Sequence, residues 1–195
     1  MIKTAIVWFK TDLRIEDNET LVKAIAISEN IIPVYCFDES HFETTTYGFK
    51  KTGSFRAQFL LESLYDLDSK LRTLGSGLRI VKGKPEEEIP KIVKQYNANK
   101  VVAKREVAFE EKRTEALVQE ALFKIKCELE TFSTSTLYHA EDLPFSIKDI
   151  PDVFTNFRKK TEKDSEIRQP FSTPTNKSSG SPIPSKWRGL SSGRI

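Results

Sequence analysis

Short apolar runs alternate along this chain with longer segments in which apolar residues recur every three or four positions. The expected strands are residues 4–9, 31–37, 78–81, 100–103 and 127–132. The expected helices are residues 19–28, 54–74, 85–96 and 110–126. Because strands and helices alternate, the sequence predicts an α/β fold: an open parallel sheet of five strands with helices on both faces.

The expected helices carry local start and stop signals. Asn18 can cap the first helix, Thr52 or Ser54 can cap the long second one, and Gly75 can end it. Pro85 suits the first position of the third helix. The long helix has an apolar stripe, which is typical of an amphipathic helix; it comprises Phe55, Phe59, Leu60, Leu64, Leu67, Leu71 and Leu74.

The periodic pattern weakens after the last expected strand. We therefore expect one domain over residues 1–135, a connecting segment over 136–168 with a short helix near 153–163, and a poorly structured extension over 169–195. In that extension 14 of 27 residues are Pro, Ser or Gly, a composition that buries too little apolar surface to fold.

Charge and cysteine content exclude several classes of function. The formal charge is +3, of which residues 169–195 supply +4, so the rest of the chain sums to −1. A neutral body argues against DNA binding by this chain alone. Cys36 and Cys127 have no metal-ligand spacing and are expected to be reduced thiols that are buried or partly buried. No apolar run is long enough to cross a membrane and no signal peptide is visible, so a cytoplasmic location is expected.

The first candidate site is the charged loop at residues 10–18, directly after the first strand. Open α/β sheets bind ligands at the carboxyl ends of their strands, so Arg14 and the loop N–H groups can face a polar or anionic ligand. The alternative is structural: an Asp12–Arg14 pair and an Asn18 cap that hold the strand-to-helix turn.

The second candidate is the segment 104–113, which leaves the fourth strand. With the strand order 3-2-1-4-5, this segment and the first loop flank one crevice. A carboxylate of Glu110 or Glu111 could accept two hydrogen bonds from the edge of a pterin or guanine ring, although the dipole also favours acids at a helix start. No catalytic set, metal cluster or glycine-rich phosphate loop is visible, so we expect neither catalytic residues nor a metal site.

A series of strings in this chain resembles the amino-terminal antenna domain of DASH-type cryptochromes, a branch of the photolyase/cryptochrome family. The strings span about residues 3–170 and keep the family's order: VWFKTDLRIEDNETL, KTGSFRAQFLLESLYDL, GKPEEEIPKI, KREVAFEE, TLYHAEDLPF, IPDVFTNFRKKTEK and IRQP. Lys10 stands where many relatives have arginine.

The resemblance implies a Rossmann-like domain that holds a light-harvesting chromophore, usually methenyltetrahydrofolate. By position, Glu111 with Glu110 beside it corresponds to the carboxylate that grips the pterin, and the loop with Lys10, Asp12 and Arg14 would lie nearby. Photorepair in the family needs FAD, bound by a separate helical domain for which this chain has no residues. The expected function is therefore a chromophore-binding module without repair activity of its own.

Two alternatives remain open. The chain could be the non-enzymatic interaction half of a split photoreceptor that pairs with a separate flavin-binding helical domain through a patch at Phe154 and Phe157. It could also be a nucleotide-binding α/β protein that uses the same crevice, since this fold supports many chemistries. The missing glycine-rich loop makes the second alternative the weaker one.

Overall fold

A computed structural model describes residues 2–175 and contains one five-stranded parallel sheet. Its order is β3-β2-β1-β4-β5, and every neighbouring pair is parallel, which confirms the predicted fold class and strand order. The strands are β1 (Ile2–Phe9), β2 (Ser28–Phe37), β3 (Arg79–Lys82), β4 (Lys100–Lys104) and β5 (Glu128–Phe132).

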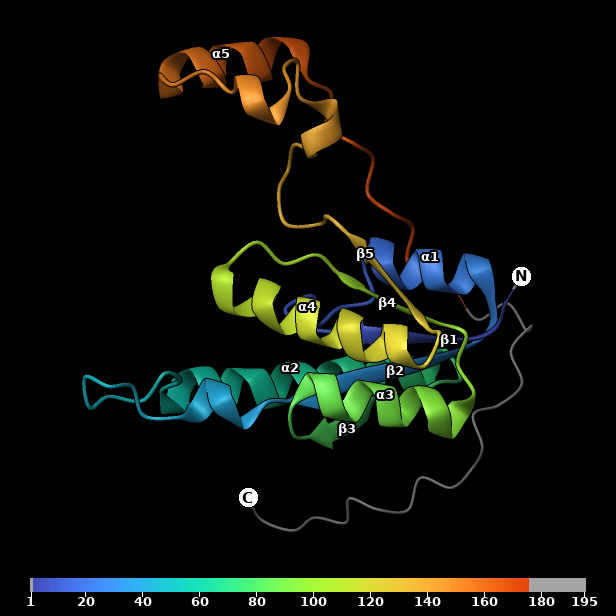
Figure 1. Ribbon diagram of the computed structural model, residues 1–195. Helices are drawn as coiled ribbons and strands as arrows, with labels where there is room; N and C mark the ends of the chain where they lie inside the picture. Colours follow the sequence, from blue (N-terminus) through green and yellow to red (C-terminus); the bar gives the residue numbers. More distant parts are fainter. Residues whose placement is uncertain (1, 176–195) are drawn as a thin grey trace.

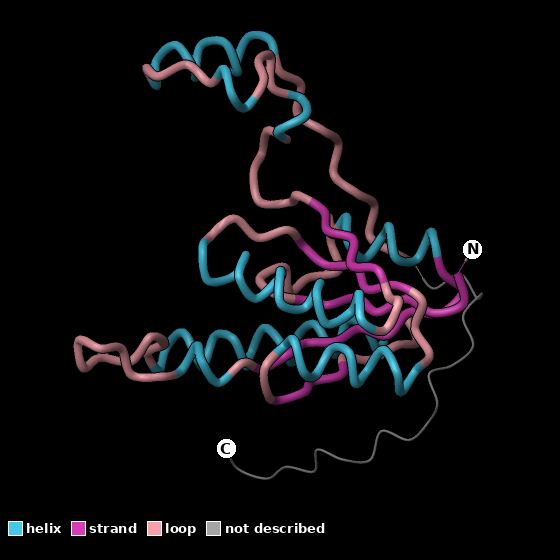
Figure 2. The backbone as a smooth tube through the Cα atoms, viewed as in Figure 1, coloured by secondary structure: helices cyan, strands magenta, loops and turns pink. Residues whose placement is uncertain are grey.

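Helices cover both faces of this sheet (Figures 1 and 2). They are α1 (Glu19–Ile27), α2 (Ser54–Thr73), α3 (Pro85–Tyr96) and α4 (Phe109–Lys124). One apolar cluster joins the sheet to α3 and α4 through residues such as Ile89 and Val118. A second cluster joins the opposite face to α1 and α2 through Leu21 and Leu67.

The central strand β1 is buried on both faces from Thr4 to Phe9, as expected for a parallel strand between two helical layers. Trp8 packs with the α3 and α4 cluster, whereas Phe9 packs with the α1 and α2 cluster. Both cysteines, Cys36 and Cys127, are buried as predicted. Burial raises the pKa of the Cys36 thiol to about 12.

The cap predictions are partly confirmed. Asn18 accepts a hydrogen bond from the Leu21 N–H, and Gly75 follows α2 with a left-handed φ of 79°. The start of α2 differs from the prediction, because Gly53 is its N-cap and makes no side-chain cap bond. The Thr52 hydroxyl instead donates to the backbone oxygen of His41, which fastens the preceding loop.

After β5 the chain forms an arm over residues 133–168, which contains η2 (Ala140–Asp142), η3 (Ile147–Asp149) and α5 (Phe154–Asp164). Figure 1 shows α5 standing away from the sheet. Arg168 donates to Asp142 and Glu141 at the base of the arm, and the Phe171 N–H donates to Asp17 beside α1. Residues 176–195, most of the expected extension, lie outside the described residues. No helix within residues 2–175 combines the length and apolar character needed to span a bilayer.

Candidate functional site

The loops after β1 and β4 meet at the carboxyl edge of the sheet. Thr11, after β1, donates its hydroxyl to Glu106 Oε1 at 3.0 Å, and Lys104 Nζ at the end of β4 donates to Thr11 Oγ1 at 2.6 Å. These contacts join segments more than 90 residues apart in sequence. The crevice between β1 and β4 predicted from strand order is therefore bridged by polar side chains.

A second bridge runs from the first loop to α4. Lys10 Nζ lies 2.9 Å from Glu115 Oε2 and 4.5 Å from the centroid of the Trp8 ring. The same carboxylate oxygen accepts from the Glu106 N–H at 3.5 Å. We call these residues the switch-point network: Lys10, Thr11, Lys104, Glu106 and Glu115.

The four charged side chains of this network are largely shielded from solvent, whereas Thr11 is exposed. The solvent-exposed fraction of the side chain is 12% for Lys10, 17% for Glu115, 13% for Lys104 and 10% for Glu106. Charges that are removed from water in this way need partners, and each carboxylate here lies near an ammonium group. Shielding also strengthens these contacts relative to ion pairs on the open surface.

The first loop is held from within. Asn18 donates its side-chain amide to the backbone oxygens of Asp12 and Arg14 at 3.2 and 2.9 Å, while Asp12 Oδ1 accepts from the Lys10 N–H at 3.0 Å. Arg14 turns back onto its own loop, because its guanidinium donates to the backbone oxygens of Glu16 and Asp17. Of the structural alternative, the Asn18 cap is therefore present, whereas the described residues show no side-chain pair between Asp12 and Arg14.

The two candidate glutamates lie in the first turn of α4. Glu110 forms an exposed ion pair with Lys51 at 3.4 Å, and the half-buried Glu111 is its neighbour. No hydrogen bond or ion pair joins either glutamate to Arg14 within the part of the chain that the structure describes. Of the five predicted binding residues, Lys10, Asp12 and Arg14 thus lie in one loop, where the N–H groups of Lys10 and Arg14 both donate to Asp12. Glu110 and Glu111 lie together at the start of α4, and within residues 2–175 no hydrogen bond or ion pair joins them to that loop.

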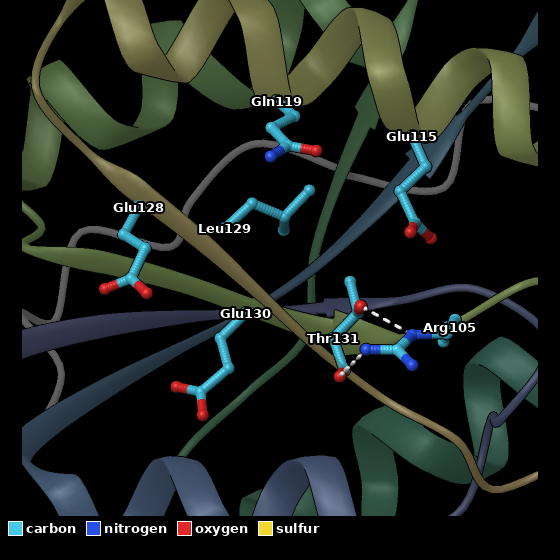
Figure 3. Close-up of a pocket in the computed structure, with 7 residues that line it drawn as sticks. All are labelled: Arg105, Glu115, Gln119, Glu128, Leu129, Glu130 and Thr131. Carbon is cyan, nitrogen blue, oxygen red and sulfur yellow. Dashed lines mark hydrogen bonds between the residues drawn. The ribbon is translucent and has the colours of Figure 1, made fainter. Parts of the chain in front are cut away.

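A polar hollow of about 560 Å³ lies between α4 and β5 (Figure 3). Its lining residues are Arg105, Glu115, Gln119, Glu128, Leu129, Glu130 and Thr131. Arg105 donates to the hydroxyl and backbone oxygens of Thr131, and Lys100 pairs with both Glu128 and Glu130. None of the five predicted binding residues lines this hollow. Residues 2–175 contain no group of acids, histidines or cysteines that could hold a metal.

The network joins the two segments that the sequence singled out, but four of its members were not among the predicted binding residues, namely Thr11, Lys104, Glu106 and Glu115. Three of them, Thr11, Lys104 and Glu106, lie inside the two segments. Glu115 lies one turn after Glu111 on α4, and that spacing could have signalled a shared helix face.

Fold and site together define a doubly wound α/β domain with a polar site at its topological switch point. Residues 5–176 match the DNA photolyase family model, and the chain belongs to this family. It is 42% identical over 172 residues to a cryptochrome DASH of Gloeobacter violaceus and 45% identical over 175 residues to one of Danio rerio. Each match covers 88% of this chain.

Solved structures agree with this assignment. A Synechocystis cryptochrome superimposes with a TM-score of 0.83 at 41% identity over 89% of this chain, and a class III photolyase from Agrobacterium tumefaciens gives 0.75 at 25% identity. The chain spans about a third of the length of these relatives, with 34% of the Gloeobacter and 36% of the Synechocystis protein covered. Members of the family bind flavin and antenna chromophores and have a separate flavin domain.

Proposed function

We propose that this chain is an antenna module that binds methenyltetrahydrofolate at the carboxyl edge of its sheet. In this proposal Glu111, with Glu110 beside it, accepts hydrogen bonds from the pterin ring, and the loop that carries Lys10, Asp12 and Arg14 lies along the ligand. Light-driven repair would require a flavin, which the proposal assigns to a separate helical domain, so this chain alone is not expected to repair DNA.

One observation carries the proposal: the loops after β1 and β4 are cross-linked at the switch point, beside the first turn of α4. Ligands of open α/β sheets bind at this place. The α4 N-cap residue, Ala108, makes no side-chain cap bond, so that helix end keeps N–H groups free of a capping side chain. Glu111 can supply the acceptor for ring N–H groups.

A titration of the purified chain with methenyltetrahydrofolate tests the proposal. We expect a saturable change in near-ultraviolet absorbance and fluorescence. Glu111→Gln should weaken binding by about tenfold or more, because a charged acceptor of two hydrogen bonds is worth roughly 1.5–3 kcal/mol. Glu120→Gln is the matched control, since Glu120 is an exposed acid on the same helix and pairs with Lys124.

Absence of a saturable change with the wild-type chain, or equal weakening by both substitutions, would contradict folate binding through Glu111. The nucleotide alternative makes the opposite prediction. If AMP raised the melting temperature of the chain and folate did not, the crevice would be a nucleotide site.

A second candidate function, the interaction half of a split photoreceptor, is favoured by the arm. Phe154 on α5 is 71% exposed and stacks on Phe157 with ring centroids 6.2 Å apart. Val153 and Ile147 on the same arm are also exposed. Apolar groups gathered on a projecting segment suit a protein partner.

Mixing the chain with the flavin-binding helical half of a full-length cryptochrome DASH tests this candidate. We expect a complex of one copy of each, seen by light scattering after size exclusion, that Phe154→Ser weakens. Phe123→Ser is the matched control, because Phe123 is 80% exposed but lies on α4 rather than on the arm. Separate elution of the two halves at micromolar concentration would exclude stable pairing at that concentration.

A further inference from the structure

We infer that Glu115 is a positioning residue: by holding Lys10 and the loop before α4 together, it fixes the direction in which Glu111 faces the ligand. The ligand part of this inference rests on the proposed function. The part that concerns the loop rests only on the contacts of the network and can be tested without any ligand.

Glu115 is bound to a loop that is held rigidly by its own hydrogen bonds. The loop after β1 is locked by Asn18, which is 3% exposed and binds two backbone oxygens and one N–H. Lys10 opens this loop directly after the buried end of β1, and its N–H is held by Asp12. The ammonium group of Lys10 therefore projects from a part of the fold with little freedom to move.

Glu115 itself makes a double contact. Its Oε2 atom accepts from Lys10 Nζ, 105 residues earlier, and from the N–H of Glu106 in the loop that leads into α4. One carboxylate thus ties both the loop and the helix to β1. Thr11 adds an independent tie, because its hydroxyl donates to the side chain of Glu106.

Helix α4 connects the network to Glu111. Glu111 and Glu115 are four residues apart on α4, so their side chains lie on one face of the helix. A helix is stiff over one turn, and a tie at Glu115 therefore limits the rotation of the first turn about the helix axis. Lys51 also contacts this turn, through an exposed ion pair with Glu110.

The ion pair between Lys10 and Glu115 suits this role because it is shielded. Removing one partner from such a pair strands the other charge away from water, so the loss is greater than for an exposed pair. By contrast, the pair of Glu120 with Lys124 on the same helix is 64% and 69% exposed. Glu120 is thus a suitable control for Glu115, because it is the same residue type on the same helix but is exposed and lies outside the network.

The experiment compares Glu115→Ala, Glu115→Gln and Glu120→Ala with the wild-type chain. Glutamine keeps an oxygen that can accept from Lys10 and from Glu106, so it should rescue part of the effect of alanine. The readouts are amide hydrogen exchange over residues 105–111 without ligand, the folate dissociation constant, and the position of the absorbance band of bound folate. The band reports the surroundings of the chromophore, which a purely stabilising residue would not change.

For Glu115→Ala we expect exchange over residues 105–111 to accelerate about tenfold or more, because the local opening loses two contacts. We expect a folate dissociation constant about tenfold higher and a shifted absorbance band. Glu115→Gln should fall between alanine and wild type, and Glu120→Ala should match wild type in all three readouts. If Glu115→Ala does not fold, Glu115→Gln carries the comparison by itself, since it removes the negative charge that pairs with Lys10; unchanged exchange, folate constant and band in that variant would then overturn the inference.

Unchanged exchange in a folded Glu115→Ala variant would overturn the inference. The inference would also be overturned if Glu115→Ala exchanged faster but kept the wild-type folate dissociation constant and absorbance band. In that case Glu115 would hold the loop without positioning any group that contacts the ligand. If the wild-type chain binds no folate, the proposed function fails and the ligand part of the inference fails with it. Hydrogen exchange then decides by itself whether Glu115 holds the loop.

Discussion

At the scale of single residues, Asn18 has the clearest structural role. Its side-chain oxygen caps α1 by accepting from Leu21, and its amide nitrogen donates to two carbonyls of the preceding loop. Asn18 is 3% exposed, so the groups that it satisfies have little access to water. The sequence predicted the cap, while the two donations depend on the path of the loop.

Asn18→Ala should lower the free energy of unfolding by about 2–4 kcal/mol, because it removes a helix cap and takes the Asn18 amide away from the Arg14 carbonyl, whereas the Asp12 carbonyl keeps the Arg14 N–H. Urea denaturation followed by circular dichroism measures the change. Asn18→Ser keeps a cap acceptor but cannot make both donations, so its loss should be intermediate. A serine variant as unstable as the alanine variant would show that the cap contributes little.

The site predictions also belong to this scale. The sequence points to Lys10, Asp12 and Arg14 through the loop after the first strand, and to Glu110 and Glu111 through the start of the following helix, and the family resemblance implies the same five residues. The residues that join the two sides of the crevice are Lys10 and Thr11 after β1, and Lys104, Glu106 and Glu115 at the end of β4, in the loop that follows and on α4. The sequence alone cannot show which of these residues contact one another, because the contacts depend on how far each side chain reaches across the crevice.

At the scale of elements, the apolar stripe of α2 is buried along one part of the helix and exposed along another. Its carboxyl-terminal half buries Leu64, Leu67 and Leu71 against the sheet. Near its start, Phe55 is 88% exposed and Phe59 is 70% exposed. The helical period predicted a single buried stripe, but the period says nothing about how far along the helix the sheet extends.

Two substitutions on α2 should therefore have opposite outcomes. Leu67→Ala should lower the free energy of unfolding by about 2–5 kcal/mol, because it leaves a cavity in a fully buried site. Phe59→Ala should change it by no more than about 0.5 kcal/mol, as expected for an exposed position. Thermal and urea denaturation provide the comparison, and a large loss for Phe59→Ala would mean that this ring is buried in solution.

The ion pair between Arg168 and Asp142 at the base of the arm is expected to weaken in acid. Hydrogen bonding to Arg168 holds the pKa of the Asp142 carboxyl below its ordinary value of 3.8. Because the folded-state pKa is lowered, the contribution of this contact is present above pH 3.8 and is lost as the pH falls through the lower folded value.

We therefore expect hydrogen-exchange protection of residues 139–142 and 165–168 to stay constant between pH 7 and 5, after correction for the intrinsic rates, and to fall in stronger acid. Arg168→Gln should lower this protection already at pH 7, while the sheet amides keep theirs. Equal loosening of arm and sheet in Arg168→Gln would show that the contact stabilises the whole domain instead.

At the scale of the whole molecule, exposed aromatic side chains gather at the end where α2 and α4 begin. Tyr47 and Phe49 stack with ring centroids 6.2 Å apart in the loop before α2, and Phe55, Phe59 and Phe109 follow at the helix starts. Figure 1 shows this loop projecting beyond the first turn of α2. Large exposed apolar groups in one region favour association.

The double substitution Phe55→Ser with Phe59→Ser should reduce binding of an anilinonaphthalene sulfonate dye and self-association in sedimentation velocity. The melting temperature should stay within about 2–4 °C of the wild-type value, because neither ring is part of the core. Unchanged dye binding would show that the dye binds to a surface other than the one formed by Phe55 and Phe59.

The sequence by itself determined the helix and strand segments, the parallel sheet and the cap at Asn18. These features follow from periodicity, from turn residues and from contacts within a few positions, all of which are encoded locally. The tertiary structure alone decided that Lys10 reaches Glu115 and Thr11 reaches Glu106, that Phe55 stays exposed, and that Arg168 closes the arm. The physical reason is distance along the chain: contacts between residues tens to a hundred positions apart form only where packing of the whole sheet brings their side chains within reach.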